Sequence, residues 1–211
     1  MLKARDAERT RGSILAAATA RFAAQGYDGT SVDQIATDAA ANKALISYYF
    51  GGKSGLYAAV LREALSGVEE ELRALRKSEE PAPERLIAFV RTFARFAADR
   101  PALPSIILRE HLAGSERIDR SALPQFLEFF KTTQAIVRDG IREGTIRADI
   151  DAHALHLTLI GGVVLFLIGA PMRARLSKRK RKALTDPALE EYLGELRRLL
   201  ETGITRRKAK R

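Results

Sequence analysis

The chain has 211 residues, 46% of them hydrophobic and 29% charged, so it is long enough to bury a core in a small domain and in a second, larger one. Its formal net charge of +10 indicates a polyanionic partner, either a nucleic acid or a membrane surface. The absence of cysteine excludes disulfides and thiolate chemistry and agrees with a reducing cytoplasm, where we expect the protein.

The first predicted helix spans about residues 7–25. Ile14, Ala18 and Phe22 lie on one apolar stripe, and Gly26 is its C-terminal stop. Basic residues precede or open this helix: Lys3, Arg5, Arg9 and Arg11. They would either add minor-groove and phosphate contacts or form ordinary solvated surface. No secretory signal pattern precedes the helix.

Residues 30–56 predict two short helices joined by a tight turn, the layout of a DNA-reading helix-turn-helix. Thr30 and Ser31 are both suitable N-caps, because Asp33 and Gln34 each follow three positions later. Three alanines, residues 39–41, carry the chain through the turn with side chains small enough for close helix packing.

The second of these helices is capped by Asn42 and buries Ile46 and Phe50, which are spaced i, i+4. Side chains in its first turns would reach base edges, while neighbouring hydroxyls, amines and a helix N-terminus after Gly52 would hold phosphates. The predicted DNA-binding residues are Thr30, Ser31, Asn42, Lys43, Ala44, Leu45, Tyr48, Tyr49 and Lys53. Each also has a plain alternative: Tyr49 packs, Lys43 is solvated, or Asn42 only caps.

Together these residues resemble the TetR/AcrR family of bacterial transcriptional regulators, over roughly residues 9–65. The resemblance depends on the Thr-led helix and on the ending Tyr48-Tyr49-Phe50-Gly51-Gly52-Lys53. Ser47 stands where the family often has tyrosine, and Leu45 where a polar base-reader is common, so the resemblance does not define the operator. It implies an all-α body that dimerises through its last two long helices and binds a small effector, with repression as the usual outcome.

Helical periodicity continues through the body and shows no strand pattern or repeat. A helix runs from Lys53 to about Leu72 and links the N-terminal helix-turn-helix part to the rest of the chain. A loop at residues 78–83 follows it. Further helices are predicted before Pro101, at 102–112, 125–143 and 152–170, where Pro171 ends one, and from Pro187 onward. The expectation is an all-α fold of about nine helices. We divide it into a helix-turn-helix domain at 1–54, a ligand-binding and dimerisation domain at 55–205 and a basic tail at 206–211.

An effector pocket is predicted where phenylalanines from two helices meet a few polar groups. The candidate ligand-binding residues are Phe89, Phe93, Phe96, Arg109, His111, Phe126, Phe130 and His156. They would hold an apolar or aromatic molecule; the alternative is an ordinary Phe-rich core. His153 and His156 lie near two aspartates, but carboxylates at a helix start usually cap it, so we expect neither a metal nor a cofactor.

A dimer interface is predicted on the last two long helices. Adjacent glycines permit close helix approach, and a leucine stripe offers more apolar surface than one partner helix covers. The residues are Thr158, Gly161, Gly162, Leu165, Tyr192, Leu193, Leu196 and Leu200. Both helices could instead be plain core. The apolar run at 157–170 is too short to span a bilayer, so we expect no membrane partner.

Most of the excess positive charge lies in two blocks, at residues 173–182 and 206–211. Such blocks are usually solvated, but they would also attract DNA, an acidic surface or an anionic effector. No enzyme motif is present. The sequence therefore predicts a homodimeric repressor released from a palindromic operator by a small, largely apolar effector. A ligand-independent regulator, an activator and a charge-driven binder of nucleic acid or membranes remain as alternatives.

Overall fold

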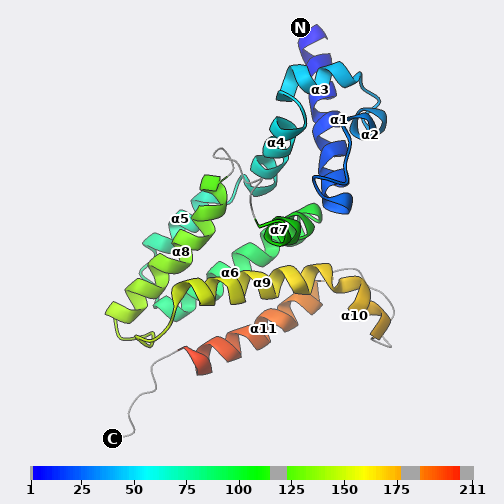
Figure 1. Ribbon diagram of the computed structural model, residues 1–211. Coiled ribbons are helices and arrows are strands. Elements are labelled where there is room, and N and C mark those ends of the chain that lie inside the picture. The colour runs from blue at the N-terminus through cyan, green and yellow to red at the C-terminus, as the bar shows by residue number, and fades with distance from the viewer. Residues whose placement is uncertain (1, 115–122, 177–185, 205–211) are drawn as a thin grey trace, which may run out of the picture. The chain divides into compact units, whose positions relative to one another are not determined.

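A computed structural model describes residues 2–114, 123–176 and 186–204. Throughout these residues the fold is helical and has no strand, which confirms the all-α class. The described ranges hold eleven helices (Figure 1): α1 Leu2–Gln25, α2 Val32–Asp38, α3 Lys43–Phe50, α4 Lys53–Leu65, α5 Glu69–Lys77, α6 Ala82–Ala98, α7 Ala102–Leu112, α8 Leu123–Arg142, α9 Ala152–Ile168, α10 Ala170–Leu176 and α11 Asp186–Gly203.

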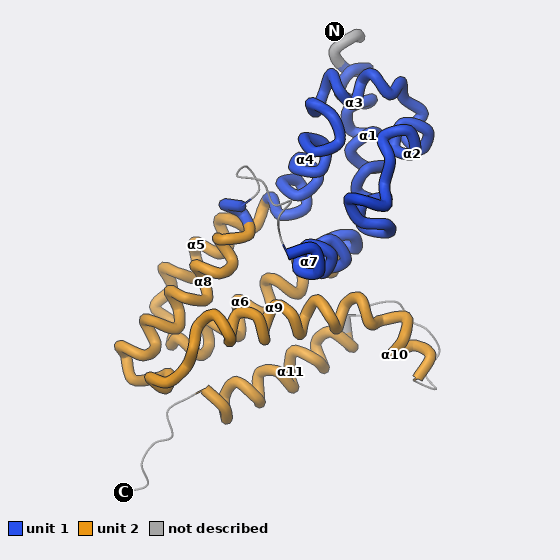
Figure 2. The backbone as a smooth tube through the Cα atoms, in the orientation of Figure 1, with its two compact units in different colours: residues 1–66, 100–125 blue, residues 67–99, 126–211 orange. Residues whose placement is uncertain are grey.

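The chain forms two compact units, and neither is continuous in sequence (Figure 2). Unit 1 comprises residues 1–66 and 100–125, and unit 2 comprises residues 67–99 and 126–211. The predicted functional boundary after residue 54 is a different kind of division and stays a prediction.

Unit 1 packs α2, α4 and α7 around α1. Ile14, Ala18 and Phe22 of α1 are buried as the stripe predicts, and Gly26 follows the helix with a φ of +75°. The N-terminal basic residues open α1 rather than precede it, because the helix already begins at Leu2. Burial of Ile35 and Ile46 brings α2 and α3 onto this core.

Two local caps shape the helix-turn-helix. Ser31 is the N-cap of α2: its side chain accepts from Gln34 N while the Gln34 side chain accepts from Ser31 N. Asn42 is the N-cap of α3, and its side-chain oxygen accepts from Ala44 N. Between them Ala40 has a φ of +48°, which turns the chain sharply. Of the two capping registers that the sequence allowed, the structure has the one with Ser31.

The helix expected from Lys53 to Leu72 is two helices, and this expectation was wrong. α4 ends at Leu65, and Gly67 takes a φ of +87°, a left-handed conformation that glycine adopts without strain. Leu65, Val68 and Leu72 are all buried on either side of the break. The apolar spacing thus continues across a turn that it does not reveal.

Unit 2 is built on α6, which contacts α5, α9 and α11. Its Leu86, Phe89 and Phe93 are almost fully buried, together with Val163 of α9. α6 begins at Ala82, so the predicted loop is shorter at its end than expected. Pro83 lies in the first turn of α6, where a missing N–H costs nothing.

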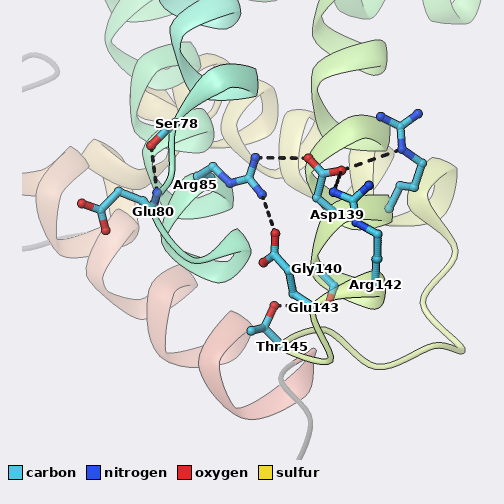
Figure 3. A network of polar contacts seen from close by, with 9 residues as sticks. Ser78, Glu80, Arg85, Asp139, Gly140, Arg142, Glu143 and Thr145 are labelled. Atoms are coloured by element: carbon cyan, nitrogen blue, oxygen red, sulfur yellow. Dashed lines mark hydrogen bonds and ion pairs between the residues drawn. The ribbon is translucent and has the colours of Figure 1, made fainter.

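α6 and α8 are joined by a buried cation (Figure 3). The Arg85 side chain is 4% exposed and lies 3.3 Å from Asp139 and 3.6 Å from Glu143. The helices approach closely here: a Cβ built on Gly140 would lie only 2.6 Å from Ala82 Cβ. Such proximity needs a residue without a side chain.

α9 and α10 meet at a 62° bend, where a single helix through Ala170 was expected. α9 ends at Ile168, and Pro171 lies in the first turn of α10 instead of ending a helix. These two differences, at Gly67 and at the bend, account for eleven helices where nine were expected. None of the described helices is by itself long and apolar enough to cross a membrane, although the bent α9–α10 pair together meets the criteria of length and composition.

Candidate DNA-binding surface and effector site

The N-terminus of α3 presents three exposed residues in a row: Asn42, Lys43 and Ala44. Asn42 uses its amide oxygen for the cap, 2.8 Å from Ala44 N, and the amide nitrogen takes no part in that bond. The small Ala44 side chain lets a base edge come close to the backbone. This end of α3 therefore has the donors and the shape expected of a reading surface.

Lys43 is the first residue of α3, and its ammonium nitrogen lies 2.8 Å from Asp33 Oδ1 and 3.0 Å from Asp33 Oδ2. Both side chains are largely exposed. The pair joins the start of α3 to the first turn of α2. Lys43 is thus solvated, as one alternative had it, and also has an ionic partner.

Further along α3, Tyr48 is 80% exposed, an unusual position for a large ring. It meets the half-buried Tyr49 edge-on, with ring centroids 5.1 Å apart. Leu45 is half-buried, so only part of it is available to a base. The two tyrosines thus place one exposed hydroxyl and one partly packed ring beside the α3 surface.

Lys53 begins α4, and its Nζ lies 4.2 Å from the centroid of the Tyr27 ring. Gly52 is the N-cap, so no side-chain cap occupies the first amides of α4. Amide groups at a helix N-terminus and an ammonium together favour an anion such as a phosphate. A phosphate contact through Lys53 therefore stays a prediction, for which this helix N-terminus is chemically suitable.

The hydroxyls of Thr30 and Ser31 are engaged in hydrogen bonds within the protein. Thr30 is 2% exposed, and its hydroxyl donates to Gly26 O at 2.8 Å, so its burial argues against the predicted phosphate contact through this side chain. Ser31 is exposed, but its hydroxyl is engaged in the capping box with Gln34. Both hydroxyls therefore fix the backbone of the helix-turn-helix and are less available for a contact with DNA.

In unit 2 the phenylalanines form a cluster of α6 and α8 side chains. Phe129 is its centre: its ring lies 6.5 Å from Phe89, 5.4 Å from Phe93 and 6.1 Å from Phe96. All four rings are buried, as in a well-packed core. Phe126 and Phe130 are half-buried at the side of the cluster.

One polar pair adjoins these rings. His156 Nδ1 of α9 lies 3.0 Å from Thr133 Oγ1 of α8, and Thr133 is fully buried. The His156 ring lies 5.4 Å from Phe130 and 6.3 Å from Phe89. A hydrogen-bonded imidazole between aromatic faces is the polar anchor expected in a mostly apolar ligand site.

The two other polar candidates, Arg109 and His111, belong to unit 1 and not to this cluster. Arg109 donates through Nε to Ala23 O at 3.0 Å and through Nη2 to Ala24 O, so it caps the C-terminus of α1. His111 is exposed, and its Nδ1 lies 3.1 Å from Ile107 O in its own helix. Both residues thus belong to a different unit from the phenylalanines, and their part in the effector pocket stays a prediction.

The predicted dimer residues divide into exposed and buried groups. On α9, Thr158 and Leu165 are exposed, and a Cβ on Gly161 would meet nothing within 4 Å. Leu193 and Leu200 of α11 are buried and line a contact with Ile87 and Val90 of α6; Leu196 lines the same contact. Leu193 and Leu200 are therefore buried within the single chain, whereas Leu196 is half-buried, and the role of all three in a dimer stays a prediction.

Gly162 and Tyr192 also make their contact within one chain. A Cβ on Gly162 would lie 2.6 Å from the Tyr192 hydroxyl, and the Tyr192 ring stacks on Phe166 with centroids 4.4 Å apart. Burial raises the pKa of the Tyr192 hydroxyl. The Arg173 guanidinium covers the same Phe166 ring, 3.8 Å from its centroid.

Thr133 and Leu157 were left out of the predicted sites, whereas Phe129 belonged to the predicted phenylalanine group and Leu199 to the predicted leucine stripe. Phe129 and Thr133 are spaced i, i+4 and therefore share the inner face of α8, a signal that was readable. The exposed Leu157 and Leu165 share one face of α9 with the half-buried Gly161, because the three are spaced i, i+4, i+8. Leu199 of α11 is 67% exposed although the adjacent Leu200 is buried, so the apolar pattern of this helix does not show which leucine faces the solvent.

Among the described residues, no group of three or more His, Asp or Glu side chains is placed to hold a metal ion. The basic block at 173–182 is described only as far as Leu176. Its remaining residues and the tail at 206–211 lie outside the described residues.

Comparison with known proteins gives this surface a context. Residues 14–60 match the family described as "Bacterial regulatory proteins, tetR family". The chain is 30% identical over 201 residues to the HTH-type transcriptional repressor SCO4008 of Streptomyces coelicolor, covering 95% of this chain and 100% of that protein. It is also 30% identical over 154 residues to the HTH-type transcriptional repressor NicS of Pseudomonas putida, covering 71% of each chain.

Among solved structures, the fold is similar to that of the transcriptional regulator FadR from Bacillus subtilis in complex with stearoyl-CoA. The TM-score is 0.69 at 19% sequence identity, covering 92% of this chain and 99% of that one. At this identity the likeness concerns the fold alone.

Proposed function

The chain belongs to the tetR family of bacterial regulatory proteins, and from this membership we propose that it is a homodimeric repressor that leaves a palindromic operator when a small, largely apolar effector binds. Like its relatives, it is a DNA-binding transcriptional regulator and not an enzyme. It acts in the cytoplasm, where bacterial DNA is accessible to it.

The observation that carries the DNA-reading proposal is the exposed surface of α3. Asn42, Lys43, Ala44 and Tyr48 are all exposed on one short helix, held at its start by a side-chain cap. In this arrangement α3 enters the major groove, and Tyr48, Tyr49 and Lys53 hold the phosphates beside it. Leu45 adds apolar contact with a thymine methyl to the extent that it is exposed.

Dimerisation is proposed through the outer faces of α9 and α11. On α9 the exposed Leu157, Thr158 and Leu165 lie around the half-buried Gly161, and on the described part of α11 the large apolar Leu199 is exposed. Large apolar side chains that remain in water are favoured in an interface. A dimer would present two copies of α3 to half-sites about one helical turn, roughly 34 Å, apart on an inverted repeat.

The effector would bind beside the phenylalanine cluster, with His156 and Thr133 as the polar anchor. FadR, whose fold is similar, is known in complex with stearoyl-CoA, a ligand with a long apolar acyl chain, which supports a ligand with an apolar part for this chain. Binding would favour a dimer state in which the two recognition helices no longer match successive grooves. A preference of a few kcal/mol for that state is enough to empty the operator.

The deciding experiment is selection of bound sequences from random duplex DNA at about 0.15 M salt, where purely electrostatic binding is weak. We expect an inverted repeat that the native chain binds and that Asn42→Ala and Tyr48→Ala fail to bind. Arg138→Ala, which removes an exposed cation from unit 2, is the matched control and should bind normally. No enriched sequence, or equal loss in the control, would return the charge-driven alternative.

A further inference from the structure

The pair between Asp33 and Lys43 is an unusual feature for a DNA-reading surface. It places a carboxylate, 71% exposed, within 2.8 Å of an ammonium that is 61% exposed at the start of α3. A carboxylate in this position repels phosphate, so at first sight it opposes DNA binding. Its effect depends on which DNA group the ammonium meets.

Helix electrostatics support the pairing. Lys43 is the first residue of α3, where the amide dipoles disfavour a positive charge, and Asp33 lies in the first turn of α2, where they favour a negative one. The contact between the two side chains therefore offsets an unfavourable position of the ammonium. Asp33 is also placed firmly, because the capping box of Ser31 and Gln34 holds the same turn.

Hydrogen-bond capacity decides what the pair can still bind. An ammonium has three donors, and the two Asp33 oxygens, at 2.8 and 3.0 Å, engage it from one side. A remaining donor can bond a neutral acceptor such as guanine O6 or N7 without displacing Asp33. A phosphate oxygen at the same place would bring a second negative charge close to the carboxylate, which is unfavourable at such separations.

From this geometry, and resting on the proposed reading role of α3, we propose that Asp33 is a specificity-determining residue: it directs Lys43 to a guanine edge and withholds it from phosphates. Asp33 needs no contact with DNA to do this. It lowers the affinity for every duplex that offers only phosphate at this position and spares the duplex that offers guanine.

The test compares Asp33→Asn, Lys43→Ala and the double variant, each measured by fluorescence anisotropy. Two duplexes are used, the one recovered by selection and a scrambled one of equal length and composition, over a range of salt concentrations. Asp38→Asn is the matched control, because it makes the same charge change on the same helix at a carboxylate paired with Arg21.

We expect Asp33→Asn to tighten binding to the scrambled duplex by about three- to tenfold. Its salt dependence should steepen by about 0.9 for each phosphate gained, which is about 1.8 for a dimer that gains one per protomer. Binding to the selected duplex should change less than twofold, so the specificity ratio falls. In the Lys43→Ala background the same change should have much less effect, and Asp38→Asn should leave the ratio as it is.

Equal tightening on both duplexes, or an undiminished effect without Lys43, would overturn the inference while the native preference for the selected duplex, and so the proposed function, still stands. A native chain that prefers no duplex would overturn the proposed function and, with it, this role of Asp33.

Discussion

Gly162 of α9 lies against the hydroxyl of Tyr192 on α11, so that a Cβ at residue 162 would be 2.6 Å from the phenolic oxygen. Tyr192 cannot move away freely, because its ring stacks on Phe166 at 4.4 Å. The neighbouring Gly161 has open space around the same position. Close packing against Tyr192 therefore requires a glycine at residue 162, whereas residue 161 has room for a larger side chain.

Gly162→Ala should destabilise the chain by about 1 kcal/mol, since the strain of overpacking exceeds the gain in helix propensity. Urea unfolding measures this. In a Tyr192→Phe background the obstructing oxygen is gone, and the same substitution should become stabilising. If Gly162→Ala costs as much without the hydroxyl as with it, the contact is not the reason for the glycine.

The outer face of α9 provides a test of the dimer. Leu165→Glu, at a residue 61% exposed in the single chain, should leave the fold intact and give monomers in sedimentation velocity. Met172→Glu, a comparably exposed apolar residue on α10, is the control and should remain dimeric. Leu193→Glu should unfold the chain instead, because it puts a charge into the α6–α11 contact. A dimeric Leu165→Glu protein would contradict the proposed interface.

Arg109 holds α7 to the end of α1 through two carbonyls. Arg109→Lys keeps the charge but loses the forked donor geometry, and we expect a loss of about 1–2 kcal/mol in free energy of unfolding. Arg138→Lys, at an exposed position, should cost nothing measurable in the same urea titration. An unchanged midpoint for Arg109→Lys would show that α7 is held by its apolar face alone.

The ion pair between Arg76 and Glu128 predicts a pH dependence. Burial by itself would raise the pKa of Glu128, but the hydrogen bond and charge of Arg76 at 2.9 Å, with Lys131, outweigh it and hold the pKa below its ordinary value. A lowered carboxyl pKa stabilises the fold above the unfolded value, near 4.3, and that contribution is lost as pH falls through the folded pKa.

Native protein should therefore exceed Glu128→Gln in stability by about 1 kcal/mol at pH 6, and the difference should shrink as the pH falls below the unfolded value and through the lowered folded pKa. Urea unfolding at several pH values measures both proteins. Glu79→Gln, an exposed change in the same unit, should show no such difference. A gap between native and Glu128→Gln that persists at the lowest pH would contradict the assignment.

The buried Arg85 offers a prediction about charge in the core of unit 2. Arg85→Met fills most of its volume and leaves Asp139 with Arg142 at 3.0 Å, so we expect a loss of only about 1 kcal/mol. Arg85→Ala adds a cavity and should cost about 3 kcal/mol. Equal costs for the two variants, measured by thermal unfolding, would mean that charge and not volume decides stability here.

Local chemistry made much of this fold predictable. Ser31 with Gln34, and Asn42 before an apolar i, i+4 pair, are short-range signals, and they identified α2 and α3 correctly. Gly67 was missed because buried side chains at 65, 68 and 72 keep helical spacing through the turn. A spacing rule detects the face of a helix and not its interruption.

The sites were harder to predict because their partners are distant in sequence. Arg109 and His111 are polar residues on an apolar helix, and nothing in their own segment says that Arg109 faces α1, 85 residues earlier, through Ala24. Likewise the leucine stripe of α11 is apolar all along, and only packing against α6 separates the buried Leu193 from the exposed Leu199.

The discontinuity of unit 1 has a consequence for how the protein is made. α1 to α4 leave the ribosome first, but the face that Leu103 and Ile106 of α7 cover has no cover until residues 67–99 of the other unit have also been synthesised. At roughly 5–20 residues per second, that interval lasts several seconds. During this interval the newly made segment α1–α4 carries an exposed apolar surface that a chaperone would recognise. Unit 1, which contains α3, is completed only after the synthesis of unit 2 has begun.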